Sequence, residues 1–180
     1  SASSYSWRRF ETSSVSVPES AAFDPVRIIE VLDRHSVRFV VIGGFAAWTQ
    51  GVPAVTTDLD IVFERSDANI DGLVHALHEL SAVYRDPAGR HLRPEAARLA
   101  SSHGSGHHLF RTDSGDLDVL RSSSEFDYER LHPQAIEVEV EGIRLQLAPL
   151  RLIIAMKEAA NRPKDRAALP LLRAALDDET

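Results

Sequence analysis

Several residue types are scarce in this 180-residue chain, and each absence narrows what the chain can be. It contains no cysteine, which excludes a disulfide framework and any metal site built on thiolates. No apolar run approaches the ~18 residues that a membrane-spanning helix needs, and the first residues lack the apolar region of a signal peptide. We therefore expect a cytoplasmic protein without a membrane partner.

The chain also has fewer positively charged residues than negatively charged ones. The formal net charge is −7, and an acidic balance disfavours a nucleic-acid partner, because phosphate binding needs a basic surface. Acids that hold a metal ion would account for part of this excess. The length is that of one domain. We expect residues 1–20, which are rich in serine, to form a flexible tail, and residues 21–180 to form a single domain that ends in helices from about residue 149.

Two glycines and two aspartates form the most informative pattern. Gly43-Gly44 closes an apolar run at residues 39–42 that predicts a buried strand, and Asp58-Leu59-Asp60 opens another apolar run. Because side chains two apart on a strand share a face, Asp58 and Asp60 project side by side. Two carboxylates at one spot need a cation between them. Hard oxygen ligands of this kind suit Mg²⁺ or Mn²⁺, which also recruits phosphate oxygens from a substrate.

The same arrangement recurs at Asp116-Leu117-Asp118. We expect Asp118, on a strand next to that of Asp58, to be the third metal ligand, with Asp116 as the alternative. A glycine-ended strand that admits a triphosphate, together with acids from two strands, is the apparatus of metal-assisted nucleotidyl transfer. Each motif alone is weak, since glycine pairs close strands in many folds and an Asp-x-Asp often lies on a solvated strand edge. Their order along the chain carries the prediction.

Together these motifs resemble the signature of the DNA polymerase beta superfamily of nucleotidyltransferases: a strand ending in Gly-Gly, an Asp-x-Asp, and a third acid between apolar residues, here Leu117-Asp118-Val119. Lys157, followed by Arg162-Pro163-Lys164-Asp165, is similar to the ending of the minimal AbiEii/MenT-like toxins. The resemblance implies an α/β fold with a small mixed sheet, helices packed against it and a C-terminal helical segment. It also implies Mg²⁺ or Mn²⁺ as cofactor and an NTP, such as ATP, as substrate. Many relatives carry an arginine where this chain has Ala54.

The resemblance further implies an acceptor and a partner. We expect transfer of a nucleoside monophosphate to RNA, specifically the 3′ end of tRNA, by a translation-inhibiting toxin whose partner is a cognate antitoxin protein. Two alternatives stay open: the same chemistry on the hydroxyl of an antibiotic or a protein, and a non-catalytic member that binds only a nucleotide or a partner. A basic groove would favour RNA, and an acidic pocket would favour an aminoglycoside.

Lysine occurs only twice, against eighteen arginines, which suggests that each lysine stands where a compact ammonium matters. Lys157 falls in the apolar stripe of a helix that starts at Pro149, and a charge there needs a partner such as a triphosphate. Alternatively, Lys157 lies at the edge of the stripe and extends its ammonium group to solvent. For Asp165 the alternative to a role in the site is that an acid is favoured near a helix N-terminus. The resemblance assigns catalysis to Asp58, Asp60, Asp118, Lys157 and Asp165. It assigns nucleotide binding to Gly43, Gly44, Thr57, Lys157 and Lys164, and Thr56 matches the threonine that is usual before the first acid.

The one long stretch of positive bias runs from residue 85 to residue 111 and is also the least regular part of the chain. Loops beside a rigid site often recognise the acceptor, and arginine suits backbone phosphates. We therefore predict RNA binding by Arg85, Arg90, Arg93, Arg98 and Arg111, with an ordinary surface loop as the alternative. Histidines in the same stretch, His103, His107 and His108, could hold a transition metal with Asp113, but their spacing gives only a weak signal.

Local patterns predict most of the secondary structure. Asp24-Pro25 and Ser66-Asp67 are N-terminal signals of two helices. Clean alternation at residues 136–140 and 143–147 predicts a hairpin. Helices are also expected near residues 45–49 and 95–100 and from Pro149 and Pro163, and strands near Leu109 and Leu117. Trp48, with Phe39 and Phe45, is expected in the core.

Overall fold

The computed structural model describes residues 22–178, so the predicted tail at residues 1–20 lies outside the described part of the chain. The helices are α1 (Pro25–Arg34), α2 (Gly43–Thr49), α3 (Asp67–Glu79), α4 (Ala96–Ala100), α5 (Tyr128–Leu131), α6 (Leu150–Ala160) and α7 (Pro163–Asp178), with the 3-10 helix η1 (His132–Gln134). The strands are β1 (Phe39–Ile42), β2 (Asp58–Phe63), β3 (Val83–Tyr84), β4 (His107–Thr112), β5 (Gly115–Leu120), β6 (Ser122–Ser123), β7 (Phe126–Asp127), β8 (Ile136–Val140) and β9 (Ile143–Leu147).

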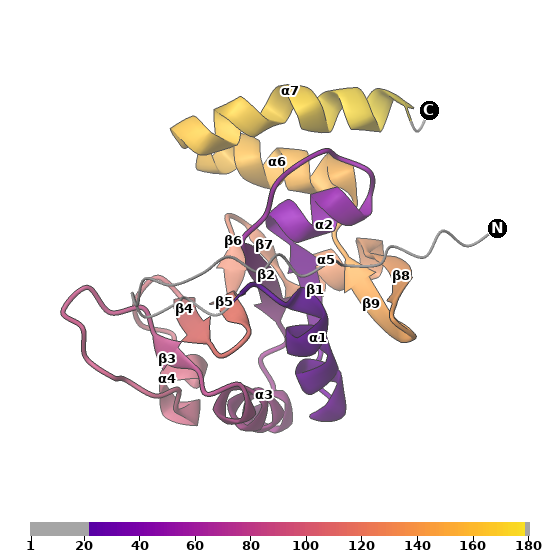
Figure 1. Cartoon of the computed structure of the whole chain (residues 1–180). Coiled ribbons are helices and arrows are strands. Elements are labelled where there is room, and N and C mark those ends of the chain that lie inside the picture. The colour runs from indigo at the N-terminus through magenta and orange to yellow at the C-terminus, as the bar shows by residue number, and fades with distance from the viewer. Residues whose placement is uncertain (1–21, 179–180) are drawn as a thin grey trace, which may run out of the picture.

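Seven of these strands form one mixed sheet in the order β3-β4-β5-β2-β1-β9-β8. The pairs β2–β5 and β1–β9 are parallel, and the pairs β1–β2, β3–β4, β4–β5 and β8–β9 are antiparallel. Strands β6 and β7 form a separate two-stranded sheet. The predicted α/β class with a mixed sheet and a C-terminal helical segment is confirmed (Figure 1).

Local signals set several of the element boundaries where they were predicted. The side chain of Asp24 accepts a hydrogen bond from the backbone N–H of Arg27 at 3.0 Å and caps α1, with a proline in the first turn. Ser66 caps α3 in the same way through the N–H of Asn69. The alternating segments pair as the hairpin β8–β9. Capping removes unsatisfied donors at the two helix starts and so defines where α1 and α3 begin.

The sheet has a buried face and a functional face. On β2, the side chains of Leu59, Ile61 and Phe63 are fully buried and belong to the apolar core. Alternation along the strand turns the intervening Asp58 and Asp60 to the opposite face, where both are partly exposed. The buried face therefore anchors the strand while its acids remain accessible.

Trp48 was expected in the core, and that prediction is wrong, because 44% of the residue is exposed. Helix α2 buries Phe45, Ala46 and Ala47, and the next position along the helix turns away from them. The Trp48 ring lies 5.9 Å from the ring of Phe45 at the edge of the buried cluster.

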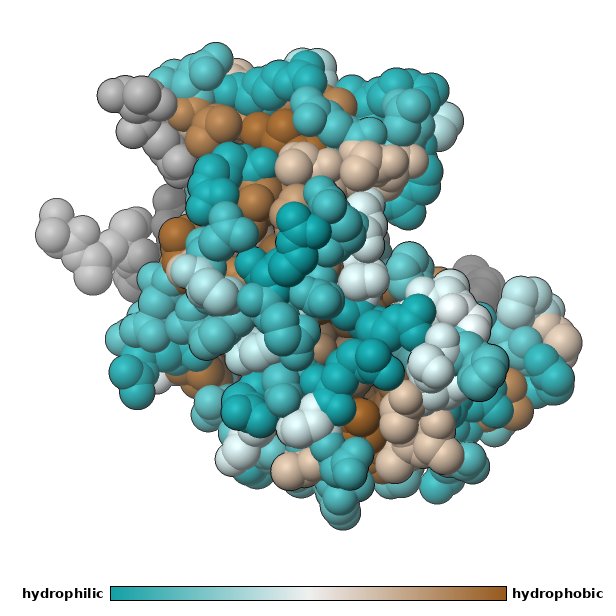
Figure 2. Space-filling model, turned by 180° about the vertical axis from the view of Figure 1, so that it is seen from behind, coloured by the Kyte–Doolittle hydropathy of each residue, from teal (hydrophilic) through white to brown (hydrophobic). Residues whose placement is uncertain are grey.

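Helices α6 and α7 pack against each other and lie above α2, at the opposite end of the molecule from α1, α3 and α4 (Figure 1). Seen from behind, the surface is mostly hydrophilic and is notched between the upper helices and the body below (Figure 2). Within residues 22–178, no helix combines the length and the apolar character that crossing a membrane requires.

Candidate active site

The register of β2 and β5 builds an array of four carboxylates. In this parallel pair Asp58 lies opposite Asp116, and Asp60 lies opposite Asp118. Antiparallel pairing places Ile42, the last residue of β1, opposite Asp60. Directly paired residues share a face of the sheet, so all four acids project from the same face beside the start of α2.

Three of the four acids converge closely enough to bind one ion. One carboxylate oxygen from each of Asp58, Asp60 and Asp118 lies within 4.8 Å of the other two, the one such group of histidine and acidic side chains among residues 22–178. Carboxylate oxygens are the ligands that Mg²⁺ and Mn²⁺ prefer, so this donor set fits the expected metal. Asp116 is not a member of the group, which favours Asp118 as the third ligand.

The two glycines of the Gly-Gly motif fit tightly against protein side chains. Gly43 has φ +69°, and a Cβ on it would lie 2.2 Å from Oδ2 of Asp60. A Cβ on Gly44 would lie 3.0 Å from Oγ1 of Thr56, and this hydroxyl donates to the backbone carbonyl of Asp58 at 2.9 Å. The absence of side chains at the motif thus lets α2 start directly against the acid array. Thr56 lies just before β2. The next residue, Thr57, which is the predicted nucleotide-binding residue, is exposed.

Crowding of the acids disfavours their charged forms. Burial, followed by the negative charges of Asp58 and Asp118, raises the pKa of Asp60 to about 7. Burial is also the main reason that the pKa of Asp118 rises to about 6, with further contributions from Asp58 and Asp116. Shifts of this size mean that the cations near these two acids do not offset their burial and mutual repulsion. A bound divalent cation would supply further positive charge.

The C-terminal helices supply cations near Asp60. Lys157 on α6 and Lys164 on α7 lie close enough that their charges pull the pKa of Asp60 down, against the larger effect of burial. Nζ of Lys157 donates to Oδ1 of the fully buried Asp165 at 3.3 Å, and Nε of Arg162 donates to Oδ2 of Asp165 at 2.6 Å. Asp165 therefore contacts both Lys157 and Arg162 and holds their side chains in place. Its predicted catalytic role would be exerted through Lys157.

Arg85 lies in the acid array. Its Nη1 donates to Oδ2 of Asp116 at 2.8 Å, and its Nη2 forms an ion pair with Oδ1 of Asp118. The side chain is 25% exposed, and its Nε is buried without a hydrogen-bond partner. The sequence placed Arg85 on an RNA-binding loop, and nothing in the local pattern connects it with acids more than thirty positions away. The guanidinium instead neutralises part of the array.

The other four arginines predicted to bind RNA differ in the contacts that their side chains make. Arg90 forms a two-pronged ion pair with Asp86 in its own loop, and the guanidinium of Arg98 lies 5.3 Å from the ring centre of Tyr84. Arg93 and Arg111 are exposed, and within residues 22–178 no side-chain ion pair involves either of them. RNA binding by the five arginines stays a prediction.

The histidines of the same stretch do not gather as a metal site. His107 is exposed, whereas His108 is buried and its Nδ1 is hydrogen-bonded to the hydroxyl of Tyr84 at 2.9 Å. Burial, together with the charges of Arg98 and Arg121, lowers the pKa of His108 to about 4. A neutral imidazole that bonds a tyrosine is a structural element of the β3–β4 region.

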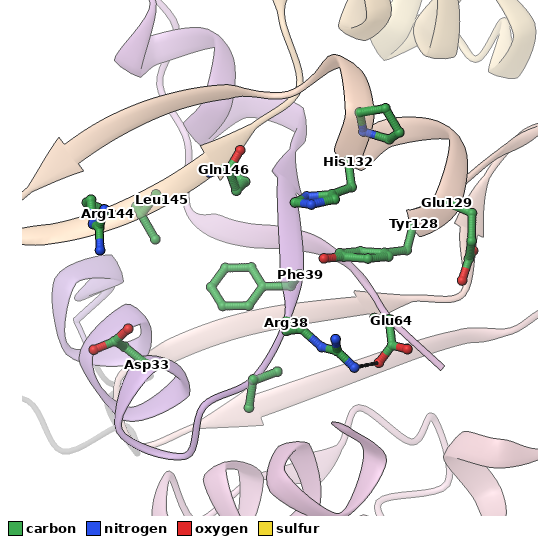
Figure 3. A pocket seen from close by; sticks show the side chains of 12 residues that line it. Asp33, Arg38, Phe39, Glu64, Tyr128, Glu129, His132, Arg144, Leu145 and Gln146 are labelled. Atoms are coloured by element: carbon green, nitrogen blue, oxygen red, sulfur yellow. Dashed lines mark hydrogen bonds and ion pairs between the residues drawn. The ribbon is translucent and has the colours of Figure 1, made fainter. Parts of the chain in front are cut away.

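A cavity of about 600 Å³ has a lining that includes none of the four acids, and Figure 3 shows the residues that line it. It adjoins Phe39, which pairs with Phe63 at the ends of β1 and β2 remote from Asp60. The rings of Tyr128 and His132 stack at 5.1 Å on one side, and charged residues of both signs surround them. This cavity is separate from the site that the acids form.

Comparison with known proteins places the fold. No protein-family model matches the chain, and no curated protein matches its sequence. Among solved structures, the chain is similar to the antibiotic-resistance factor ANT(2'')-Ia in solution, with a TM-score of 0.55 and 15% identity over 86% of this chain and 83% of that one. The crystal structure of ANT(2'')-Ia with adenylyl-2''-tobramycin matches with a TM-score of 0.52 and 16% identity, over 86% and 88% of the two chains. TM1012 from Thermotoga maritima, a proposed nucleotidyltransferase, matches with a TM-score of 0.50 and 16% identity over 85% and 90%.

At these identities the matches establish the fold, which is that of nucleotidyltransferases, as the sequence predicted. The narrower resemblance to AbiEii/MenT-like toxins stays a prediction. The acids Asp58, Asp60 and Asp118, predicted from their alternation on two strands, are the same three that the register gathers into one group.

Proposed function

We propose that the chain is a metal-dependent nucleotidyltransferase that moves a nucleoside monophosphate from an NTP to an acceptor hydroxyl and releases pyrophosphate. The observation that carries the proposal is the convergence of Asp58, Asp60 and Asp118 within 4.8 Å, on a nucleotidyltransferase fold and near the lysines of α6 and α7. A carboxylate triad facing cations is suited to hold a metal ion and a triphosphate between them.

Each residue has a defined task in this proposal. A bound Mg²⁺ would neutralise phosphate charge and polarise the α-phosphorus. Asp58 and Asp60 hold the ion, with Gly43 allowing the start of α2 to lie against Asp60. Asp118 faces the acceptor side of the array. Lys157, oriented by Asp165, neutralises the departing pyrophosphate, and Lys164 adds a second positive charge. Arg162 donates a hydrogen bond to Oδ2 of Asp165 and so holds the carboxylate in its orientation.

The acceptor that we propose is RNA, specifically the 3′ end of tRNA, with the chain acting as a toxin that a cognate antitoxin protein restrains. Support comes from the acceptor side of Asp118. On β4, Leu109 lies opposite Asp118 and Arg111 lies opposite Asp116, so both share the face of the acids. His107 and Arg111 are exposed there, and no acid on β4 accompanies them. A surface with this charge suits an anionic acceptor.

An aminoglycoside acceptor is the second candidate. It is favoured by the fold shared with ANT(2'')-Ia, which was solved with adenylyl-2''-tobramycin, and by the net charge of −7. A polycationic acceptor would need carboxylates near Asp118, where Asp116 is already paired with Arg85. The positive charge on β4 supports our ranking of RNA above the aminoglycoside as acceptor; we place a protein hydroxyl and a binding-only role below both.

One experiment tests the reaction and the acceptor together. The protein is incubated with each α-³²P-labelled NTP and Mg²⁺, with total RNA in one arm and tobramycin in another. We expect label in RNA, and we expect it to be lost with excess chelator and in Asp60→Asn. Asp71→Asn, which changes an exposed acid on α3, is the matched control and should keep wild-type transfer. Transfer by Asp60→Asn at the wild-type rate would contradict the assignment, and label in tobramycin alone would replace RNA as acceptor.

The RNA surface has its own test. Arg93→Glu with Arg111→Glu should weaken RNA binding and reduce the slope of log affinity against log salt by about 1.4, since each lost phosphate contact on a single strand removes ~0.7. Arg144→Glu with Arg173→Glu changes two exposed arginines elsewhere and should leave the slope unchanged. An unaltered slope in the first double variant would move the proposal to a small-molecule or protein acceptor.

A further inference from the structure

Gln50 is the C-cap residue of α2, the helix that begins against the acid array. Its side-chain nitrogen donates to the carbonyl of Ala46, one turn back in α2, at 2.7 Å and to the carbonyl of Ala148 at 3.0 Å. Its side-chain oxygen accepts the backbone N–H of Leu150, the first residue of α6, at 3.1 Å. One side chain therefore joins α2 to segments that lie 98 and 100 positions further along the sequence.

The hydrogen bond to Leu150 caps α6. The N-cap residue of this helix is Pro149, whose side chain makes no capping hydrogen bond. The N–H groups of Leu152 and Ile153 donate to the carbonyl of Pro149, whereas the N–H of Leu150 donates to Gln50. Leu150 is buried, and a buried N–H at a helix start is costly when it has no acceptor. Gln50 thus stabilises the start of α6 from the end of another helix.

A short segment, residues 147–150, connects β9 to α6 and is held from two sides. Strand β9 pairs with β1 through Leu147 and Val41. The backbone N–H of Ala148 donates to the carbonyl of Val41 at 2.9 Å, and the carbonyl of Ala148 accepts from Gln50. The start of α6 is therefore fixed to the sheet by β1 and to α2 by Gln50.

Helices α2 and α6 lead from Gln50 to the same place. Helix α2 begins at Gly43, where an added Cβ would lie 2.2 Å from Oδ2 of Asp60. In α6, Lys157 lies about two turns beyond Leu150 on the same side of the helix, and its positive charge acts on Asp60. Figure 1 shows α2 directly below α6. The two helices are thus joined at one end by Gln50 and approach the same carboxylate at the other.

A small tilt of α6 at its start would be enlarged at Lys157. Seven residues of helix extend about 10.5 Å, so a tilt of about 10° would move this residue by about 2 Å. A misplacement of about 1 Å at a catalytic group can reduce a rate about 100-fold. The hydrogen bonds of Gln50 act at the point from which such a tilt would start.

We infer that Gln50 is a positioning residue of the active site: it fixes the start of α6 to the end of α2 and thereby sets where Lys157 stands relative to Asp60 and the triphosphate. The inference rests on the proposed function, because that function assigns Lys157 to the departing pyrophosphate. An amide is suited to the role, since it offers both donors and an acceptor and carries no charge that would disturb the acids.

The position of α6 can be measured directly, because the chain contains no cysteine. Cysteines for spin labels are introduced at two exposed positions, Ala159 on α6 and Asp71 on α3, and the distance between the labels is measured by double electron–electron resonance without metal or nucleotide. We expect a narrow distance distribution in the otherwise wild-type chain and a broader or shifted one in Gln50→Leu. Gln146→Leu is the matched control, since this glutamine bonds Glu137 in the β8–β9 hairpin, and it should keep the wild-type distribution.

Triphosphate binding shows whether this position matters to the site. The α,β-methylene analogues of the four NTPs are titrated with Mg²⁺ by calorimetry, and the analogue that binds most tightly is used. Gln50→Leu should weaken its binding about 10-fold or more, the value of one hydrogen bond to a charged group. The affinity for Mn²⁺ without nucleotide should not change, because the acids lie on β2 and β5. In a Lys157→Ala background, Gln50→Leu should cause no further loss, because Gln50 acts through Lys157.

A broad distance distribution in the wild-type chain would overturn the inference, and this measurement needs no variant that could fail to fold. An unchanged distribution in a folded Gln50→Leu would also overturn it, as would an equal loss of analogue affinity with and without Lys157. These results would leave the proposed function intact. A wild-type protein that binds none of the four analogues would instead overturn the proposed function, while the distance measurement would still decide whether Gln50 fixes α6.

Discussion

Replacing Gly43 by alanine should remove metal binding without unfolding the protein. Gly43 has φ +69°, and an added Cβ would lie 2.2 Å from Oδ2 and 2.9 Å from Cγ of Asp60. Ordinary contact begins at 3.4 Å, so the carboxylate would have to move by about 3.4 − 2.2 = 1.2 Å. Mg²⁺–oxygen distances are about 2.0–2.1 Å and tolerate little variation. A displacement of this size takes Asp60 out of the coordination sphere.

The expected magnitudes separate the two effects of the substitution. The left-handed backbone should cost alanine about 1–2 kcal/mol, which for a chain of this length lowers Tm by about 2–8 °C. The lost carboxylate ligand should weaken Mn²⁺ binding by about 100-fold or more. The effect on metal affinity should thus be much larger than the modest loss of stability implies.

Gly51→Ala provides the matched control. Gly51 has φ +90°, and no atom lies within 4 Å of its Cβ position, so this variant carries backbone strain without touching an acid. Both variants are measured by calorimetric Mn²⁺ titration and by thermal unfolding without metal. We expect both to lose some stability and only Gly43→Ala to lose the metal. Wild-type Mn²⁺ affinity in Gly43→Ala would refute the reasoning, as would an equal loss of affinity in Gly51→Ala.

Two further predictions concern charge. Asp165→Asn should lower the free energy of unfolding, measured in urea, by about 2 kcal/mol. This is less than the ~3–5 kcal/mol lost when a fully buried ion pair is broken, because Arg162 and Lys157 keep some contact with water. Unchanged stability would show that the contacts of Asp165 contribute nothing. The affinity for Mg²⁺ should rise about 100-fold or more between pH 5 and pH 7.5 and then level off. Burial is the main reason that the pKa values of Asp60 and Asp118 are raised to about 7 and 6, so at low pH both ligands carry protons that the metal must displace. A calorimetric affinity that does not change with pH in this range would contradict the prediction.

Some parts of the site were within reach of local rules. The period of two along a strand placed Asp58 and Asp60 on one face, and the same rule indicated Asp118 on its own strand. Thr56 precedes β2, and its hydroxyl donates to the backbone carbonyl of Asp58. Nucleotide binding by Thr57 stays a prediction.

Other parts had no local signal. Arg85 reads as one more cation in a positive stretch, and its ion pairs span 31 and 33 positions. The same holds for the choice between Asp116 and Asp118, which are equivalent in the sequence. Trp48 looked like a core residue because its neighbours are apolar, but the short helix α2 exposes it.

By itself the sequence determined which residues alternate, where helices α1 and α3 begin, and that carboxylates would project together from two strands, because these features depend on backbone geometry over a few residues. Only the tertiary structure decided which charges meet. The register of β2 with β5 joined the acids into one array. The pairing of β3 with β4 placed Arg85 beside two of them, and the fold brought the lysines of α6 and α7 near Asp60. A charge has no preferred partner until packing brings one within a few ångströms, because electrostatic attraction is strong only at short range and away from water.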